Sequence, residues 1–311
     1  MTRCFCLTTL VALLASFATS APAQVTLKYK FPDGRKSTSE VVIKTSQTLT
    51  LGGNELLSGA EQSLTVSAVN GQRAADGTLV VNNTVEALKT TVTLPGGTEL
   101  EYDSTKPDAA PPGTQFDVLL DVFKATGKST WETVMSQDNR VVAVKGRDAA
   151  YADLPQNIRD AMKAQIDPDY LRTAANDELA KLPSEPVSPG DSWERSNTLR
   201  LDAGQRFKLT NKYTYQGSVQ QDGKNLEKIA SQLTEVTYFV EGESPLKVLE
   251  SDLKVAATEG LILFDPEYGQ VVSQRSKSQI TGALKLEVMG MEFPGQLDLT
   301  MENSATMKDV P

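Results

Sequence analysis

The sequence contains no histidine, and its only two cysteines, Cys4 and Cys6, lie near the N-terminus. Without histidine the chain cannot build a Ser-His-Asp or Cys-His catalytic centre, nor a histidine-ligated zinc site. Only chemistry by carboxylate, lysine, tyrosine or hydroxyl groups remains open. We therefore predict a non-enzymatic protein with no catalytic residue, no metal ligand and no cofactor.

Long hydrophobic runs are also missing. The longest, from Leu7 to Phe17, is shorter than the roughly 20 apolar residues that a transmembrane helix needs. It follows Arg3 and precedes Ala21-Pro22-Ala23, which completes the pattern of a secretory signal peptide. We predict that residues 1–23 are removed by cleavage near Ala23. The mature chain then begins at Gln24, has no thiol and no acyl-anchored cysteine, and lies in the periplasm of a bacterium or outside the cell.

Positive charge is in deficit. The chain has 31 lysines and arginines against 40 aspartates and glutamates, a formal net charge of −9. Affinity for nucleic acids comes mainly from cationic side chains on phosphates, so this balance excludes a nucleic acid as the expected partner. An acidic surface also favours solubility, so we do not infer a cationic ligand from it.

Alternating apolar and polar residues dominate what is present. In the opening segment, Val25, Leu27, Tyr29 and Phe31 share one face, which predicts a half-buried strand. Similar runs separated by Gly, Asn, Asp and Pro turns predict antiparallel strands in two regions, residues 24–148 and 193–311. These runs are Val41–Leu51, Leu64–Ala68, Leu79–Val85, Thr90–Leu94, Leu100–Ser104, Trp131–Met135, Val141–Val144, Gln205–Gln216, Ile229–Val240, Leu246–Val255, Leu261–Phe264, Ile280–Val288 and Leu297–Met301. Residues 303–311 carry little apolar content, and we expect them to fray.

Helical spacing is confined to the middle of the chain. Thr114 to Asp117 has capping-box spacing, and the apolar positions from Phe116 to Phe123 predict a short helix that ends near Gly127. In the connector, residues 149–192, we expect Asp153 to cap one helix and Asp167-Pro168 to begin a second. The second helix has an apolar stripe of Leu171, Ala174, Ala175, Leu179 and Leu182. We predict that the connector helices cover a sheet and join both regions into one composite domain; a partner-binding helix is the alternative.

Two acidic motifs are candidate sites. Asp265-Pro266-Glu267-Tyr268-Gly269 puts two carboxylates beside a turn, but it lacks the spacing of a calcium loop and is more typical of a solvated hairpin. Glu99, Glu101 and Asp103 alternate on one strand face, either as an acidic patch or as a carboxylate pair. A catalytic pair needs a defined separation that spacing in sequence does not supply.

Aromatic residues are few, at 6% of the chain, so their grouping matters. Tyr213, Tyr215 and Phe207 share one face of a predicted strand and form either a core or the floor of a ligand groove. Trp193 follows Pro189-Gly190-Asp191-Ser192, and we expect it to be a buried anchor where the second region begins.

Several short segments together carry a resemblance to a known family. They are Leu27 to Phe31, Pro186 to Trp193, Tyr213-Thr214-Tyr215-Gln216-Gly217 and Gly260 to Gly269. With the predicted leader, the chain resembles an uncharacterised family of secreted bacterial envelope proteins. More distantly, it is similar to the half-barrel of periplasmic lipoprotein carriers, which hold acyl chains in a concave sheet. The resemblance implies an α+β, mostly β fold: a large, curved, half-barrel-like antiparallel sheet with a few helices on its concave face. No catalytic residues come with this resemblance.

Three functional hypotheses follow from these patterns. The first is an exported, non-enzymatic protein that binds a lipid or another apolar or amphiphilic ligand in its curved sheet, with the helices Phe116–Phe123 and Leu154–Leu182 as plug or lid. The second is a structural module with a filled core, whose partner is another envelope protein. The third is a carboxylate-based hydrolase of envelope polymers that uses Glu99, Glu101, Asp265 or Glu267.

Overall fold

A computed structural model describes residues 24–106, 113, 116–200, 205–240, 246–288 and 290–310 of the chain. The predicted signal peptide and the first two residues of the predicted capping box, Thr114 and Gln115, lie outside these residues. The description below therefore begins at Gln24.

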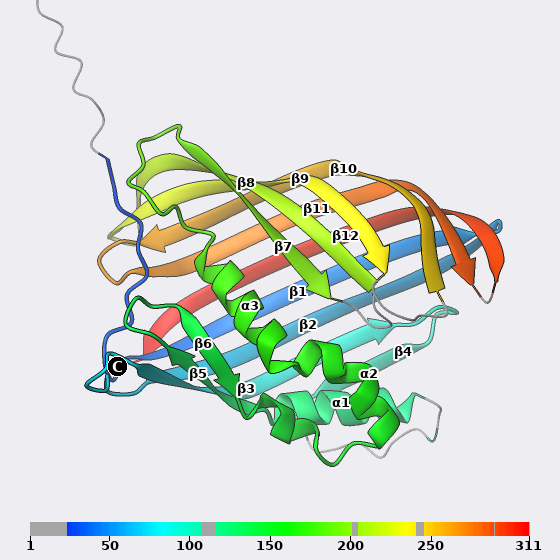
Figure 1. Cartoon of the computed structure of the whole chain (residues 1–311), viewed down its shortest axis with the longest axis horizontal. Coiled ribbons are helices and arrows are strands. Elements are labelled where there is room, and N and C mark those ends of the chain that lie inside the picture. Colours follow the sequence, from blue (N-terminus) through cyan, green and yellow to red (C-terminus); the bar gives the residue numbers. More distant parts are fainter. Residues whose placement is uncertain are drawn as a thin grey trace, which may run out of the picture.

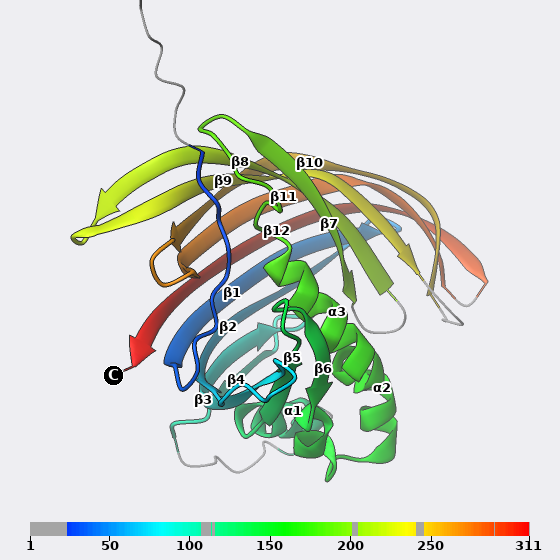
Figure 2. The ribbon, with the colours of Figure 1, turned by 60° about the vertical axis from the view of Figure 1, so that its left-hand side comes forward.

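The described chain forms one 12-stranded antiparallel sheet in the order β6-β5-β3-β2-β1-β12-β11-β10-β9-β8-β7, with β4 paired to β3 beside this path. The sheet is open and strongly curved, and its two ends approach each other across a concave trough (Figures 1 and 2). At its middle, β1 pairs with β12, from Lys36 opposite Val310 to Leu51 opposite Gly295. The strands are β1 Lys36–Leu51, β2 Asn54–Asn70, β3 Leu79–Thr93, β4 Glu99–Asp103, β5 Thr130–Met135, β6 Val141–Lys145, β7 Ser192–Arg200, β8 Gln205–Gln221, β9 Lys224–Val240, β10 Leu246–Asp265, β11 Gln270–Val288 and β12 Met291–Val310.

The helices lie on the concave side of the sheet, as the resemblance implies (Figure 2). They are α1 Asp117–Gly127, the short 3₁₀ helix η1 Arg147–Tyr151, α2 Gln156–Ile166 and α3 Pro168–Leu179. The predicted start of α3 is confirmed, because Asp167 accepts a hydrogen bond from the Tyr170 amide and Pro168 occupies the first turn. The prediction that Asp153 caps α2 is wrong: α2 begins at Gln156 and has no side-chain cap, because the N-cap position is occupied by Pro155, which has no side-chain acceptor.

Alternation of side chains places most of the buried apolar residues on the concave side of the sheet. One core cluster lies on the concave side of the C-terminal strands and includes Ile280, Leu284, Leu297 and Leu299. A second lies under α3, where Leu171, Ala175 and Leu179 pack on Leu79, Val81, Met135, Val141 and Val144. A third lies where β8, β9 and β10 meet the N-terminal segment and contains Leu27, Leu182, Val187, Tyr213, Tyr215, Ile229, Ile262 and Phe264. The curved sheet thus buries apolar residues without closing the trough along its length.

A row of alternating charges crosses the convex face. Glu61, Lys44, Glu302, Lys277 and Glu259 are successive cross-strand neighbours on β2, β1, β12, β11 and β10. Lys44 forms an ion pair with Glu61 at 2.8 Å, and Lys277 forms one with Glu302 at 2.7 Å. Opposite charges directly across neighbouring strands favour this register over one shifted by a residue.

Two sequence predictions about the chain ends are wrong. Residues 25–31 are extended, but they form only an isolated bridge, between Val25 and Val187, and no strand of the sheet. The segment from Asn303 to Val310 does not fray; it is the last part of β12, because β1 pairs with it as far as Val310 and β11 pairs with it as far as Thr306. The predicted runs Leu246–Val255 and Leu261–Phe264 are one strand, β10. No helix in the described ranges is both long enough and apolar enough to span a membrane.

Candidate functional site

The candidate site is the concave trough beneath α3. It contains two cavities of about 550 Å³ each. The strap-side cavity lies toward the N-terminal segment, and the edge-side cavity lies toward β7, β8 and β9. Glu178, Gln274 and Asn303 line both cavities, so the two spaces adjoin beneath α3.

The strap-side cavity has mainly apolar walls. The sheet supplies small and apolar side chains from β1, β2, β3, β5, β11 and β12, while α3 supplies its apolar stripe from above. The apolar lining residues are Tyr29, Phe31, Val41, Val66, Ala68, Val81, Met135, Val141, Ala175, Leu179, Val271, Ala305 and Met307. Small residues such as Ala68 and Ala305 leave space where larger ones would fill it. A volume in this range and a largely apolar lining are typical of small-molecule pockets.

The edge-side cavity is more polar. Tyr170, Tyr213, Leu199 and Leu209 line it together with Asp177 and other charged side chains. Burial of Asp177, the cause of its shift, raises the pKa of that carboxyl above its ordinary value.

Polar groups are concentrated where the cavities meet. Lys181 forms an ion pair with Glu178 at 2.6 Å and donates a longer hydrogen bond of 3.5 Å to Gln274. The side-chain oxygen Oδ1 of Asn303 is buried and has no hydrogen-bond partner among the described residues. Buried acceptors are rarely left unsatisfied, so this oxygen is an unusual feature of the junction.

Two tyrosines close to this junction keep their protons. Burial, followed by the negative charge of Glu178, raises the pKa of Tyr213 to about 12 and raises that of Tyr29 still further. Both phenols are therefore neutral near neutral pH. They add aromatic surface and hydroxyl groups to the walls without adding charge.

An N-terminal strap, residues 24–31, closes one end of the trough. It runs across the strand ends in Figure 1, and both backbone groups of Val25 pair with Val187 at 2.9 Å. Further along, the Lys30 amide donates to Gly269 O at 2.9 Å. Inward-facing Leu27 and Tyr29 pack on the core of β8, β9 and β10. The alternation in this segment is thus real, but it serves a packed strap and not a strand of the sheet.

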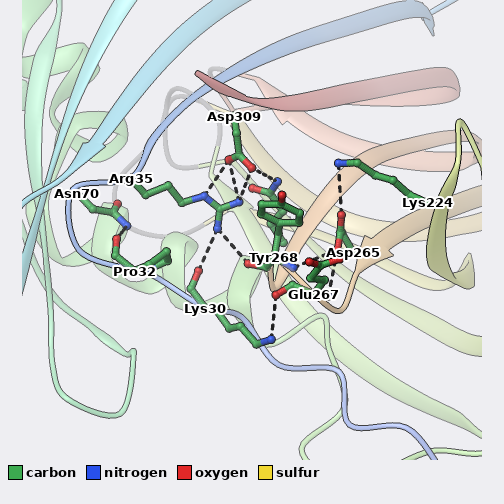
Figure 3. Close-up of polar contacts among 10 residues, drawn as sticks. Lys30, Pro32, Arg35, Asn70, Lys224, Asp265, Glu267, Tyr268 and Asp309 are labelled. Atoms are coloured by element: carbon green, nitrogen blue, oxygen red, sulfur yellow. Dashed lines mark hydrogen bonds and ion pairs between the residues drawn. The ribbon is translucent and has the colours of Figure 1, made fainter. Parts of the chain in front are cut away.

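A polar network holds the strap to the sheet (Figure 3). Arg35 Nε donates to Asp309 Oδ1 at 2.8 Å, and Arg35 Nη1 donates to the Tyr268 carbonyl oxygen at 3.0 Å. Lys30 Nζ donates to the carbonyl oxygens of Pro266 and Glu267 at 2.8 and 3.0 Å. These contacts join the strap, the last strand and the β10–β11 turn, so the end of the trough is fixed by residues far apart in sequence.

Helix α3 spans the trough between the two edge strands. Asn176 hydrogen-bonds to the backbone of Val141 in β6. On the opposite edge, Trp193 Nε1 donates to Lys181 O and Arg195 Nε donates to Ala180 O, both at 2.8 Å. The prediction that Trp193 is a buried anchor is confirmed in part. Its ring stacks on Tyr213 with centroids 5.9 Å apart, but the residue is only half-buried.

The acidic residues considered from sequence do not converge on the trough. Asp265 is 2% exposed, and its Oδ1 accepts the amides of Glu267 and Tyr268, as in a hairpin turn. Glu99 and Glu101 are exposed on β4, which lies at the opposite end of the sheet from this turn (Figure 1). Among the described residues, no three His, Cys, Asp or Glu side chains form a cluster that could hold a metal ion.

The aromatic residues considered from sequence are mostly core. Tyr215 and Phe207 are buried in two different clusters, whereas Tyr213 is buried and also lines the edge-side cavity. Sequence reasoning did not single out Lys30, Arg35, Asn176 or Ala305. Of these residues, only Lys30 was marked by the alternation of the strap. That pattern placed Lys28 and Lys30 together on the outer face and predicted that both are exposed to solvent.

Several solved structures align with most of this chain, at low sequence identity and with TM-scores below 0.5. Lipovitellin, in a structure concerned with its lipid–protein interactions, aligns with 91% of this chain at 9% identity and a TM-score of 0.44. This chain spans 26% of the lipovitellin chain. An outer membrane channel from Pseudomonas putida F1 aligns over 90% of this chain and 98% of its own, at 7% identity and a TM-score of 0.25. A Bacteroides fragilis protein with a YmcC-like fold aligns over 88% and 98%, at 10% identity and a TM-score of 0.23.

Sequence comparison gives one family. The profile described as "Family of unknown function (DUF6263)" matches residues 76–235, from just before β3 into β9. Among curated proteins, no sequence matches this chain. The matched range includes α3 and the strands at both edges of the sheet.

Proposed function

The chain belongs to DUF6263, a family of unknown function, and from that premise we propose that it is a non-enzymatic binding protein for an apolar or amphiphilic molecule such as a lipid. The observation that carries this proposal is the strap-side cavity, a hollow of about 550 Å³ between the concave sheet and α3. Its apolar lining matches hydrocarbon, and its position inside the trough removes part of a bound chain from water.

The two alternatives find less support. A structural module with a filled core would leave no cavity of this size beneath its helices. A carboxylate-based hydrolase needs two acids that converge in one cleft. Here Asp265 is occupied by the amides of its own turn, and β4, which carries Glu99 and Glu101, is at the far end of the sheet.

In this proposal α3 acts as a lid. It is joined to β6 through Asn176 and to β7 through the carbonyl oxygens of Ala180 and Lys181. The connection rests on a few hydrogen bonds and an apolar stripe, so α3 can separate from one edge while the sheet remains paired. Opening at one edge would give a ligand access to both cavities.

Export is part of the same proposal. Removal of residues 1–23 would place the binding protein outside the cytoplasm, where a carrier for an apolar molecule that crosses an aqueous space has a use. Mass spectrometry of protein recovered after expression with residues 1–23 should find Gln24 as the first residue. A chain that retains Met1 to Ala23 would contradict export by cleavage.

Binding is tested with the mature chain and N-phenyl-1-naphthylamine, an uncharged dye that fluoresces in apolar surroundings. We expect the dye to bind and to be displaced by straight-chain alcohols. Each added methylene should tighten binding roughly threefold to fourfold until the cavity is full, because burial contributes about 0.8 kcal/mol per methylene. Native mass spectrometry of the purified protein provides a second readout. If the protein does not bind the dye and no lipid co-purifies with it, the proposal is refuted.

A further inference from the structure

An outer hollow of about 890 Å³ adjoins the strap-side cavity at the strap. Tyr29, Lys30, Phe31 and Arg35 line both spaces. The inner cavity and the outer hollow are therefore adjacent at Lys30 and Arg35, which are drawn in Figure 3.

The outer hollow is cationic in an acidic protein. Lys28, Lys30, Arg35 and Lys36 line it, against the two carboxylates of Glu267 and Asp309. Asp309 is already engaged, since it forms an ion pair with Arg35 at 2.8 Å and accepts a hydrogen bond from Gln270. Among the described residues, no carboxylate forms an ion pair with Lys28, Lys30 or Lys36. The formal charge of the whole chain is −9, so this concentration of unpaired ammonium groups is a local exception.

The ammonium of Lys30 is held in position. Its Nζ donates to the two turn carbonyl oxygens of Pro266 and Glu267, and an ammonium has three donors. One N–H therefore remains for an acceptor in the hollow. Lys28 and Lys36 are exposed and line the hollow, whereas Arg35 is fixed by Asp309 and the Tyr268 carbonyl.

We propose that the outer hollow binds the anionic head group of the amphiphile whose chain occupies the strap-side cavity. The ligand class is then a carboxylate or phosphate amphiphile, and Lys28, Lys30 and Lys36 select its head group. This inference rests on the proposed function, because it takes the apolar cavity as the site of the chain. Charge-assisted hydrogen bonds to an anion supply the selectivity.

The test compares laurate with methyl laurate, which has the same chain and no charge. Both are titrated against the mature protein loaded with N-phenyl-1-naphthylamine. We expect laurate to displace the dye more strongly than methyl laurate does. The double variant Lys28→Gln, Lys36→Gln should weaken laurate roughly threefold to tenfold, as expected for the loss of two partly solvated charge contacts, and leave methyl laurate unchanged.

A matched control removes two other exposed lysines, Lys208 and Lys212, which lie on the opposite face of β8 from Leu209 and Tyr213. The variant Lys208→Gln, Lys212→Gln changes the net charge by the same amount and should leave both affinities as in the unmodified protein. An equal loss of laurate in both double variants would mean that only overall charge matters, and it would overturn the head-group site.

The outcomes separate this inference from the proposed function. If methyl laurate binds and the Lys28, Lys36 variant binds laurate normally, the cavity binds chains but the outer hollow does not select their head groups. If neither compound displaces the dye, the proposed function itself fails. Inorganic phosphate forms a third arm: displacement of laurate by millimolar phosphate, without displacement of methyl laurate, would support an anion site, whereas no effect of salt or phosphate on laurate would oppose it.

Discussion

The side chain of Asn176 in α3 pairs with the backbone of Val141 in the edge strand β6. Its Nδ2 donates to Val141 O at 2.8 Å, and its Oδ1 accepts from Val141 N at 3.0 Å. A helix side chain here takes the place of a neighbouring strand on the open edge of the sheet. The contact covers an edge that would otherwise present unpaired backbone groups, and it fixes α3 above the trough.

We expect Asn176→Ala to destabilise the protein by about 1–3 kcal/mol, because a backbone donor and acceptor of β6 lose their partner. Urea unfolding followed by circular dichroism measures the change. The control Arg172→Ala removes only an exposed ion pair with Asp169 on the same helix and should alter the free energy of unfolding by less than about 0.5 kcal/mol. Equal effects of the two substitutions would contradict a structural role for the amide.

Gly269 leaves space for the strap. An added Cβ would lie 2.4 Å from Lys30 Cγ and 2.7 Å from Lys30 N, and the residue has φ +65. We expect Gly269→Ala to displace the strap. Hydrogen exchange at the Lys30 amide should then be faster, and so should proteolysis of the segment on the N-terminal side of Arg35. Gly53→Ala is the matched control, because Gly53 also has positive φ, at +85, and nothing lies within 4 Å of its added Cβ. The strap should stay protected in that variant.

Ala305 lines the strap-side cavity, and its neighbour Ser304 is exposed on the convex face. We expect Ala305→Trp to occupy part of the cavity and to reduce N-phenyl-1-naphthylamine binding at least about tenfold, because the indole replaces the bound molecule. Ser304→Trp adds the same side chain outside the trough and should bind the dye normally. Circular dichroism confirms that both variants are folded. Normal dye binding by folded Ala305→Trp would place the dye elsewhere.

Glu302 occupies the centre of the convex charge row. The hydrogen bond and charge of Lys277, followed by the charge of Lys44, lower the pKa of Glu302 below its ordinary 4.5. A lowered folded pKa means that the charge contributes stability above the unfolded pKa and that this contribution is lost as the pH falls through the folded pKa. We expect Glu302→Gln to lower the urea midpoint slightly near neutral pH and to match the unmodified protein in strong acid. High salt should shrink the difference at neutral pH, since these groups are exposed. A difference that persists in acid would point to lost packing instead of lost charge.

The pKa of Asp103 is also lowered, in this case by a hydrogen bond from a residue close in sequence. The Thr105 hydroxyl, which donates to Asp103 Oδ1 at 2.6 Å, and then the Thr105 amide lower the pKa of Asp103 to about 2. We expect Thr105→Val to raise this pKa toward 3.8 in an NMR titration, because the larger of the two hydrogen bonds is lost. Lys106→Gln removes a nearby positive charge that lowers the same pKa less than the Thr105 hydrogen bonds do, so it should raise the pKa less. A larger effect of Lys106→Gln would show that charge, not hydrogen bonding, controls the carboxyl.

Much of the local structure was predictable from the sequence. The two-residue alternation of residues such as Ile280, Leu284 and Leu286 depends on neighbours along the chain, so it predicted the strands and their inward faces. The Asp167-Pro168 start of α3 was predictable for the same reason. Strand lengths were underestimated, because polar side chains on the convex face hide strand character where ladder hydrogen bonds to both neighbours maintain it.

The site was much less predictable. The alternation in residues 25–31 correctly predicted which face is buried, but it did not predict whether the segment is a strap or a strand of the sheet. A strap packed across strand ends and a strand inside a sheet both bury one face, so the pattern is the same for the two. No sequence feature near Arg35 predicts its contact with Asp309, and none near Asn176 predicts its contact with Val141. Each pair depends on how strands far apart in sequence are ordered.

By itself, therefore, the sequence determined the chemistry that is available and the faces that are buried: no imidazole anywhere, fewer positive than negative charges, and strands with one apolar face. The tertiary structure alone decided that β1 and β12 meet at the centre, that α3 bridges the two edges, and that lysines of the strap gather beside a cavity. The physical reason is the distance along the chain over which each interaction acts. Side-chain periodicity and capping act over a few residues, whereas a cavity exists only where the curvature of the whole sheet holds distant side chains apart.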